Sequence, residues 1–104
     1  MQQRDYIERL IQQIAAFIAR IVGAAQRGDG QGAEEALDAA WAALGFRRRD
    51  ALRLDDATLR LLLGAKVTLG ADLFEAQANL EETRSNPEIA DELRNRAAAL
   101  RGGT

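Results

Sequence analysis

The sequence predicts an all-α protein, and three observations carry that prediction. The apolar class makes up 47% of the 104 residues, much of it alanine and leucine, which favour closely packed helices. Only one proline is present. Apolar residues recur at steps of three and four along most of the chain, the period of an amphipathic helix. We therefore expect one domain over residues 1–104, with four helices and a flexible linker. The helices are expected at about residues 3–26, 33–44, 56–83 and 87–100, and the linker at 27–32.

The first expected helix has a wide apolar face. At about 100° per residue its large apolar side chains cover an arc of roughly 160°: Tyr6, Ile7, Leu10, Ile11, Ile14, Phe17, Ile18, Ile21 and Val22. Five isoleucines recur at alternating steps of four and three, the spacing of a coiled-coil seam: Ile7, Ile11, Ile14, Ile18 and Ile21. Tyr6, Leu10 and Phe17 would then face the long helix. We expect this seam to form a two-fold homodimer, because the arc is wider than a neighbouring helix normally covers. The alternative is a monomer in which the second and long helices cover the whole arc.

The linker contains three glycines, and no Lys-Ser/Thr pair follows them, so a phosphate-binding loop is not predicted. The second helix would place Leu37, Trp41 and Leu44 on one face and end at Gly45. Its pattern is typical of one helix of a tetratricopeptide-type hairpin. No period repeats along the chain, so an array of repeats is not expected.

The long helix expected at 56–83 can be capped by Asp55 or Asp56. Gly64 and Gly70 each indicate either a close approach between helices or, at Gly70, a break. Lys66 is an unusual core-facing charge, because its position lies in the middle of the helix's apolar face. It must extend to the surface, pair with a carboxylate, or act as a reactive amine.

The last helix should begin at Pro87, after Asn86 as its cap. Its apolar stripe is narrow, so we expect it on the surface of the bundle: Ile89, Leu93, Ala97 and Leu100.

Arginines are concentrated between the second and long helices. Residues 46–54 hold four arginines and one aspartate, although the whole chain has a net charge of −2. Arg47, Arg48, Arg49 and Arg53 are candidates for binding an acidic protein partner. The alternative is a solvated loop in which they pair with Asp50, Asp55 and Asp56. Nucleic acid is an unlikely partner, because no aromatic residues alternate with these arginines.

Composition narrows the function classes. The chain has no cysteine and no histidine, which excludes disulfides, thiolate nucleophiles and the commonest zinc ligands. The carboxylates are spaced as solvated helix faces, so we expect no enzyme activity, cofactor or metal. The N-terminus does not resemble a secretory signal, and a cytoplasmic location is the expectation. We expect an interaction or assembly module with an unknown protein partner. A peripheral membrane-surface protein using the first helix is the alternative, and an enzyme using carboxylates and Lys66 is a remote third.

Two segments carry a resemblance: Asp5-Tyr6-Ile7-Glu8-Arg9-Leu10-Ile11, and Glu35-Ala36-Leu37-Asp38 after a glycine-containing linker. They resemble a family of short, functionally uncharacterised bacterial helical proteins. The resemblance implies an N-terminal helix joined to a tetratricopeptide-like hairpin, and a bacterial origin. It implies no functional residue.

Overall fold

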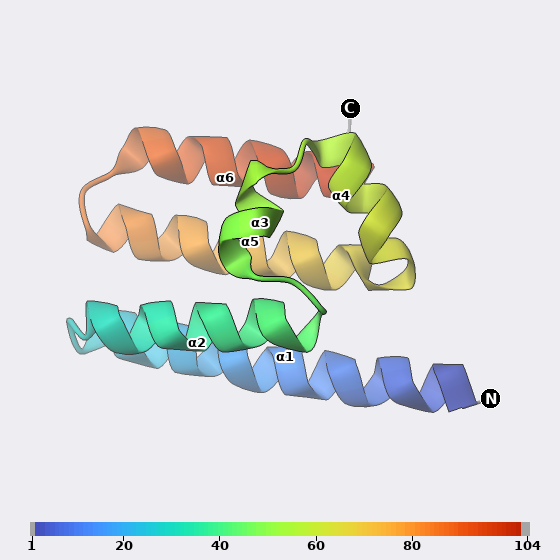
Figure 1. The fold of residues 1–104 in the computed structure, drawn as a ribbon. Coiled ribbons are helices and arrows are strands. Elements are labelled where there is room, and N and C mark those ends of the chain that lie inside the picture. The colour runs from blue at the N-terminus through green and yellow to red at the C-terminus, as the bar shows by residue number, and fades with distance from the viewer. Residues whose placement is uncertain (1, 103–104) are drawn as a thin grey trace.

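The computed structural model describes residues 2–102, which form helices joined by short turns (Figure 1). In chain order the elements are α1 (Gln2–Gln26), α2 (Gly30–Ala43), α3 (Arg48–Arg53), α4 (Asp56–Leu63), the 3₁₀ helix η1 (Gly64–Lys66), α5 (Val67–Thr83) and α6 (Pro87–Leu100). The predicted all-α class is confirmed. The bounds of α1 and α6 agree with the sequence pattern to within a residue.

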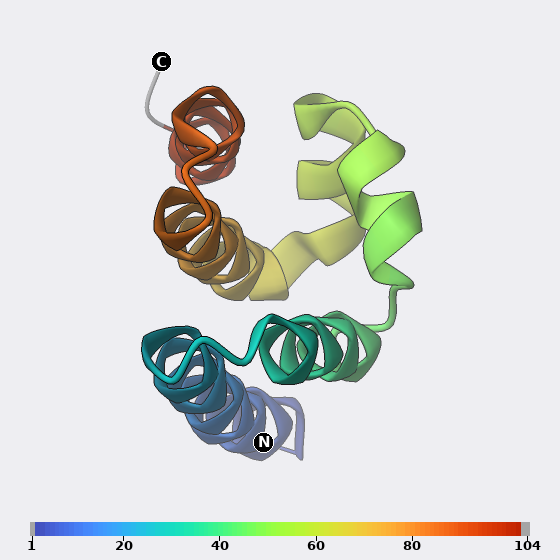
Figure 2. The ribbon, with the colours of Figure 1, turned by 90° about the vertical axis from the view of Figure 1, so that its left-hand side faces the viewer.

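Two antiparallel hairpins organise the fold, as the end view in Figure 2 shows. One consists of α1 and α2, the other of α5 and α6, and α5 packs against both α1 and α2. The short helices α3 and α4 form an arch on one side, which connects α2 to η1 and α5. The basic candidate residues lie on this arch, and α1 lies on the opposite lower edge.

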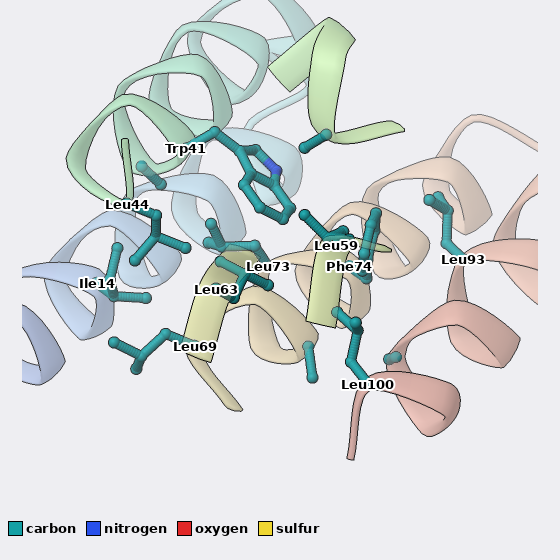
Figure 3. Packing of buried hydrophobic residues seen from close by; sticks show 14 of the residues in the cluster. Ile14, Trp41, Leu44, Leu59, Leu63, Leu69, Leu73, Phe74, Leu93 and Leu100 are labelled. Atoms are coloured by element: carbon teal, nitrogen blue, oxygen red, sulfur yellow. The ribbon is translucent and has the colours of Figure 1, made fainter. Parts of the chain in front are cut away.

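The main core fills the space that α1, α2, α5, α6 and the arch enclose (Figure 3). Trp41 and Phe74 are fully buried there, with ring centroids 5.3 Å apart, a separation typical of stabilising aromatic pairs. Leu59 and Leu63 close the core from α4. A smaller cluster lies where α1, α2 and α5 meet, built on Ile21, Leu37 and Leu80 with alanines around them.

The predicted linker is shorter than expected. Helix α2 begins at Gly30, so the linker expected at 27–32 is reduced to the turn 27–29, and the predicted start at 33 was too late. Asp29 caps the helix, since its carboxylate accepts a hydrogen bond from the N–H of Gly32 at 2.9 Å. Its own N–H donates to the carbonyl of Ala24 at 2.8 Å. The aspartate outweighs the helix-breaking tendency of the flanking glycines.

The prediction of one helix over 56–83 was wrong. The chain breaks at Gly64, which has φ 57° and ψ −122°, a conformation that residues with a Cβ rarely adopt. Gly70 is not a break, because it lies inside α5. A Cβ added at Gly70 would stand 2.7 Å from Cδ1 of Leu63, so this glycine permits the close approach of α4 to α5. Asp55 caps α4 as predicted, accepting from the N–H of Thr58 at 2.7 Å.

Two further features of the chain differ from the predictions. The loop expected around residues 46–54 contains α3, whose Ala51 is fully buried against the core. In α6 the buried stripe is Ala90, Leu93, Ala97 and Leu100, and Ile89 is exposed. Helix α6 therefore covers the core more completely than the sequence stripe indicated.

Candidate interaction surfaces

Three of the four candidate arginines form an exposed group on the arch. Arg47, Arg49 and Arg53, which we call the basic surface, are exposed on α3 and the residue before it. Within residues 2–102 none of the three makes an ion pair with a carboxylate. The structure therefore brings these three predicted residues together with their charges available to solvent.

Arg48 behaves differently from its neighbours. Its guanidinium pairs with Glu34 and also forms an ion pair with Asp38, in which Nε lies 2.9 Å from Oδ1. These contacts tie the start of α3 to α2 and leave only 17% of the side chain exposed. One nitrogen, Nη1, is buried without a hydrogen-bond partner among the described residues. Arg48 is thus anchored within the chain, although the sequence grouped it with the partner-binding arginines.

Two of the three aspartates expected to neutralise the basic surface bind other groups. Asp55 caps α4, and the N–H of Thr58 lowers the pKa of this exposed carboxyl below its usual value. Asp56 accepts a hydrogen bond from Nε of Arg96 at 2.7 Å. Asp50 is exposed and makes no ion pair among the described residues. The alternative in which these aspartates pair with the arginines is therefore not met.

Arg96 holds the arch to α6, and the sequence did not single it out. Its Nη1 donates to the carbonyl of Leu52 at 2.8 Å, and its Nη2 donates to that of Leu54. Its guanidinium also lies 4.8 Å from the centroid of the Phe74 ring. Nothing in the pattern of α6 distinguishes this arginine from Arg94 or Arg101, because its partners come from a distant part of the chain.

Glu34, near the N-terminal end of α2, contacts two arginines. Besides Arg48 it accepts from Nη1 of Arg84 at 2.6 Å, and Arg84 also donates to the carbonyl of Gly30 at 3.2 Å. Burial alone would raise the pKa of Glu34, but the hydrogen bonds from Arg84 and Arg48 outweigh it and hold this pKa below its usual value. The same contact with Glu34 raises the pKa of Arg84.

Lys66 is half-buried and hydrogen-bonded to the backbone. Its Nζ donates to the carbonyl of Leu44 at 2.8 Å, at the end of α2, where carbonyls lack helical partners. A cation is also favoured at this end of a helix dipole. Among the sequence alternatives, the contact agrees with a lysine that extends to the edge of the core, and no carboxylate pairs with it among the described residues.

The predicted isoleucine seam is divided between core and surface. Ile14 and Ile21 are only 1% exposed and lie in the chain's own core, so they cannot also form an external seam. Ile11 is 48% exposed, and Ile7 and Ile18 are partly buried. Leu10 is buried as expected. Tyr6, which was expected to face the long helix, is half-exposed instead.

Next to the buried face of α1 lies a stripe of apolar residues that are exposed or only partly buried. Projected at about 100° per residue, its members fall within an arc of roughly 80°: Ile7, Ile11, Ala15, Ile18 and Val22. We call these five residues the apolar stripe. At its C-terminal end the stripe borders a hollow of about 190 Å³ between α1 and α5, lined by Ile21, Val22, Ala25, Gln26, Ala76, Asn79, Leu80 and Thr83.

No protein-family model, curated protein or solved structure matches this chain. The resemblance to a bacterial helical family stays a prediction. Among the helices in residues 2–102, none has the length and hydropathy that crossing a bilayer requires. In the same part of the chain no cluster of three or more carboxylates is placed to hold a metal ion. The two surfaces on α3 and α1 are therefore interpreted from their geometry.

Proposed function

We propose that the chain is a non-catalytic protein-interaction or assembly module that binds an acidic segment of a partner protein on the basic surface. The observation that carries the proposal is that Asp55 and Asp56 bind other groups and not these arginines. One caps a helix and the other holds Arg96, so neither forms an ion pair with Arg47, Arg49 or Arg53, and Asp50 is the acidic residue within α3. Unpaired guanidinium groups are well suited to carboxylates, which they bind through two parallel hydrogen bonds.

The surroundings of the basic surface add an apolar component. A hollow of about 320 Å³ lies beside it, lined by Asp38, Ala42, Phe46, Arg47, Arg48 and Arg49. Phe46 is half-buried and packs edge-on against Trp41, with centroids 6.2 Å apart, so its position is fixed. A segment with carboxylates flanking one apolar side chain would match this arrangement, with the apolar group in the hollow and the carboxylates on the arginines.

A direct binding measurement tests the proposal. The probe is a fluorescein-labelled peptide of alternating glutamate and leucine, titrated with the protein and followed by fluorescence anisotropy at low salt. Replacing Arg47, Arg49 and Arg53 together by glutamine should weaken binding about 10-fold or more, because rim charges contribute strongly at low ionic strength. The fold should be unaffected, since all three side chains are exposed.

A matched control separates local recognition from overall charge. Arg9 and Arg20 are exposed on the polar side of α1, and Arg27 is exposed in the turn that follows it. Replacing these three by glutamine makes the same change in net charge. This control should bind the peptide within about twofold of the unmodified protein. Equal losses in both variants, or no binding by the unmodified protein, would contradict the proposal. Stronger binding to a labelled single-stranded DNA than to the peptide would favour nucleic acid instead.

A further inference from the structure

We propose that the apolar stripe of α1 binds a second copy of this chain, with the two α1 helices antiparallel and a two-fold axis beside Ala15. This inference does not depend on the acidic partner. The basic surface lies on the arch, on the side of the molecule opposite the junction of α1 and α5 (Figure 2). One surface can therefore fail its test without affecting the other.

The order of residues in the stripe is symmetric, and this property points to a second copy. The midpoint of Ile7 and Val22 is also the midpoint of Ile11 and Ile18, and it falls between Ile14 and Ala15. When two such helices pack antiparallel, Ile7 of one copy meets Val22 of the other, and Ile11 meets Ile18. A two-fold contact requires this self-complementarity. The small Ala15 lies at the crossing point, where the helices approach most closely.

The length of α1 supplies a second argument. Figure 1 shows that the N-terminal part of α1 extends past the end of α2 and past the beginning of α5. The second turn of this overhanging helix holds Tyr6 and Ile7, and Tyr6 is half-exposed. In the antiparallel arrangement the overhang of each copy lies over the C-terminal half of the other α1. The hollow beside Val22 lies at that position.

The charges along this face permit the approach. On α5, next to the stripe, Asp72 is paired with Nη2 of Arg101 at 2.7 Å. Asn79 accepts a hydrogen bond from Nη2 of Arg94 at 2.9 Å. Projected at about 100° per residue, the charged side chains of α1 in or beside the stripe are Arg4 and Glu8, both near the N-terminus of the helix. In the antiparallel register the two copies of each residue lie near opposite ends of the contact, so no bare like charges face each other.

Covering the stripe removes apolar surface that one chain leaves in water. Ile11 is 48% and Val22 is 40% exposed, and both lie at positions that the second copy contacts. Burial of such side chains drives association. The stripe also lies on one rigid helix, so little conformational entropy opposes the contact.

The first experiment measures mass in solution. Light scattering on the chromatographed protein at about 100 µM should give twice 11.3 kDa. The variant Ile11→Asp should remain folded, because the side chain is half-exposed, and should weaken the dimer about 100-fold or more, since each interface carries the change twice. Leu61 is 81% exposed on α4, far from the stripe in sequence and on the arch. Leu61→Asp is the control that should remain a dimer.

The second experiment tests the register. The chain has no cysteine, so single cysteines can be introduced without background reaction. Ile7→Cys and Val22→Cys proteins should cross-link efficiently with a short bismaleimide when mixed, and poorly when each is alone. Ala15→Cys should cross-link alone, because it lies beside the axis. Strong cross-linking of Ile7→Cys with itself would indicate a parallel pair and contradict the proposed arrangement.

The outcomes that overturn the proposal are specific. A monomeric mass at 100 µM for the unmodified protein, with no cross-link in the mixed sample, would show that the stripe does not bind a second copy. If that monomer sedimented with anionic lipid vesicles, and Ile11→Asp abolished the sedimentation, the stripe would be a membrane-surface contact. A dimer that survives both Ile11→Asp and Val22→Asp would place the interface elsewhere.

Discussion

Helices α6 and α1 show opposite relations between apolar surface and cover. In α6 a narrow stripe faces α5 and the arch, and all four of its buried residues are at most 5% exposed. In α1 a much wider arc faces α2 and α5, which bury Leu10, Ile14, Ile21 and Ala24 but leave the apolar stripe exposed or only partly buried. Some helices have more apolar surface than their neighbours can cover. The comparison teaches that such a helix shows where a fold has surface left for association.

The two regions also differ in how their polar residues are used. Ion pairs cross between α5 and α6, where Arg94 reaches Glu82 at 2.8 Å and Arg101 reaches Asp72 at 2.7 Å. Such exposed pairs each make a small contribution to stability. No ion pair joins α1 to another helix among the described residues. The α5–α6 hairpin is therefore held by burial supplemented by charge, and α1 by burial alone.

The largest expected loss of stability comes from a substitution in the core that α6 covers. Phe74→Ala removes a fully buried ring that packs against Trp41 and under Arg96, and it should lower the free energy of unfolding by about 3–5 kcal/mol. Ile11→Ala, on the uncovered side, should cost under about 1 kcal/mol when measured below the concentration of dimer formation. Urea denaturation measures both changes. Similar losses would mean that α1 is as fully covered as α6.

The next effect concerns the arginine that joins the arch to α6. Arg96→Met should lower the free energy of unfolding by about 2–3 kcal/mol, because the carbonyls of Leu52 and Leu54 and the carboxylate of Asp56 lose their donor. Arg94→Met is the control. Its pair with Glu82 is exposed and should contribute much less than the contacts of Arg96. If the two variants lost the same free energy of unfolding, Arg96 would contribute no more to stability than an ordinary surface arginine.

A smaller effect is expected at the end of α2. Lys66→Met keeps the length of the side chain but removes the donor to the Leu44 carbonyl, and should cost about 1 kcal/mol. Thermal unfolding measures the change, with Lys66→Arg as a variant that retains a donor and should lose less. A gain of stability in Lys66→Met would show that desolvation of the ammonium outweighs its hydrogen bond.

The smallest effect is a dependence on pH. The folded-state pKa of Glu34 is lower than its usual value, so its contribution to stability is present above that usual value. The contribution is lost as the pH falls through the folded pKa. The free energy of unfolding, measured from neutral to strongly acidic pH, should therefore fall less steeply for Glu34→Gln than for the unmodified protein. Identical slopes would show that Arg48 and Arg84 do not stabilise the carboxylate.

Period and capping signals were enough to predict some elements of this chain. The apolar period defined α1, and proline after asparagine marked the beginning of α6. The break at Gly64 was not predictable, because the apolar pattern continues through η1 and only the backbone angles of Gly64 reveal it. Helix α3 was missed for a related reason. Six residues do not form a stable isolated helix, and what holds them is the burial of Ala51 and the hydrogen bonds from Arg96.

The candidate surfaces were only partly predictable. The density of charge identified Arg47, Arg49 and Arg53, but it could not separate them from Arg48, whose partners Glu34 and Asp38 lie on another helix. The isoleucine period identified α1 as having surplus apolar surface. It placed the seam through Ile14 and Ile21, because a single helix does not reveal the directions from which α2 and α5 approach.

The contact between Arg96 and the arch can form only late during synthesis of the chain. Leu54, whose carbonyl Arg96 binds, precedes it by 42 residues in the chain. At about 5–20 residues per second, a ribosome makes the arch roughly 2–8 s before the side chain that holds it. During that interval α1 and α2 can already pair, because their contacts are local, while α3 has no anchor at its C-terminal end. Residues 47–53 therefore acquire their folded geometry late, after α1 and α2 have been made.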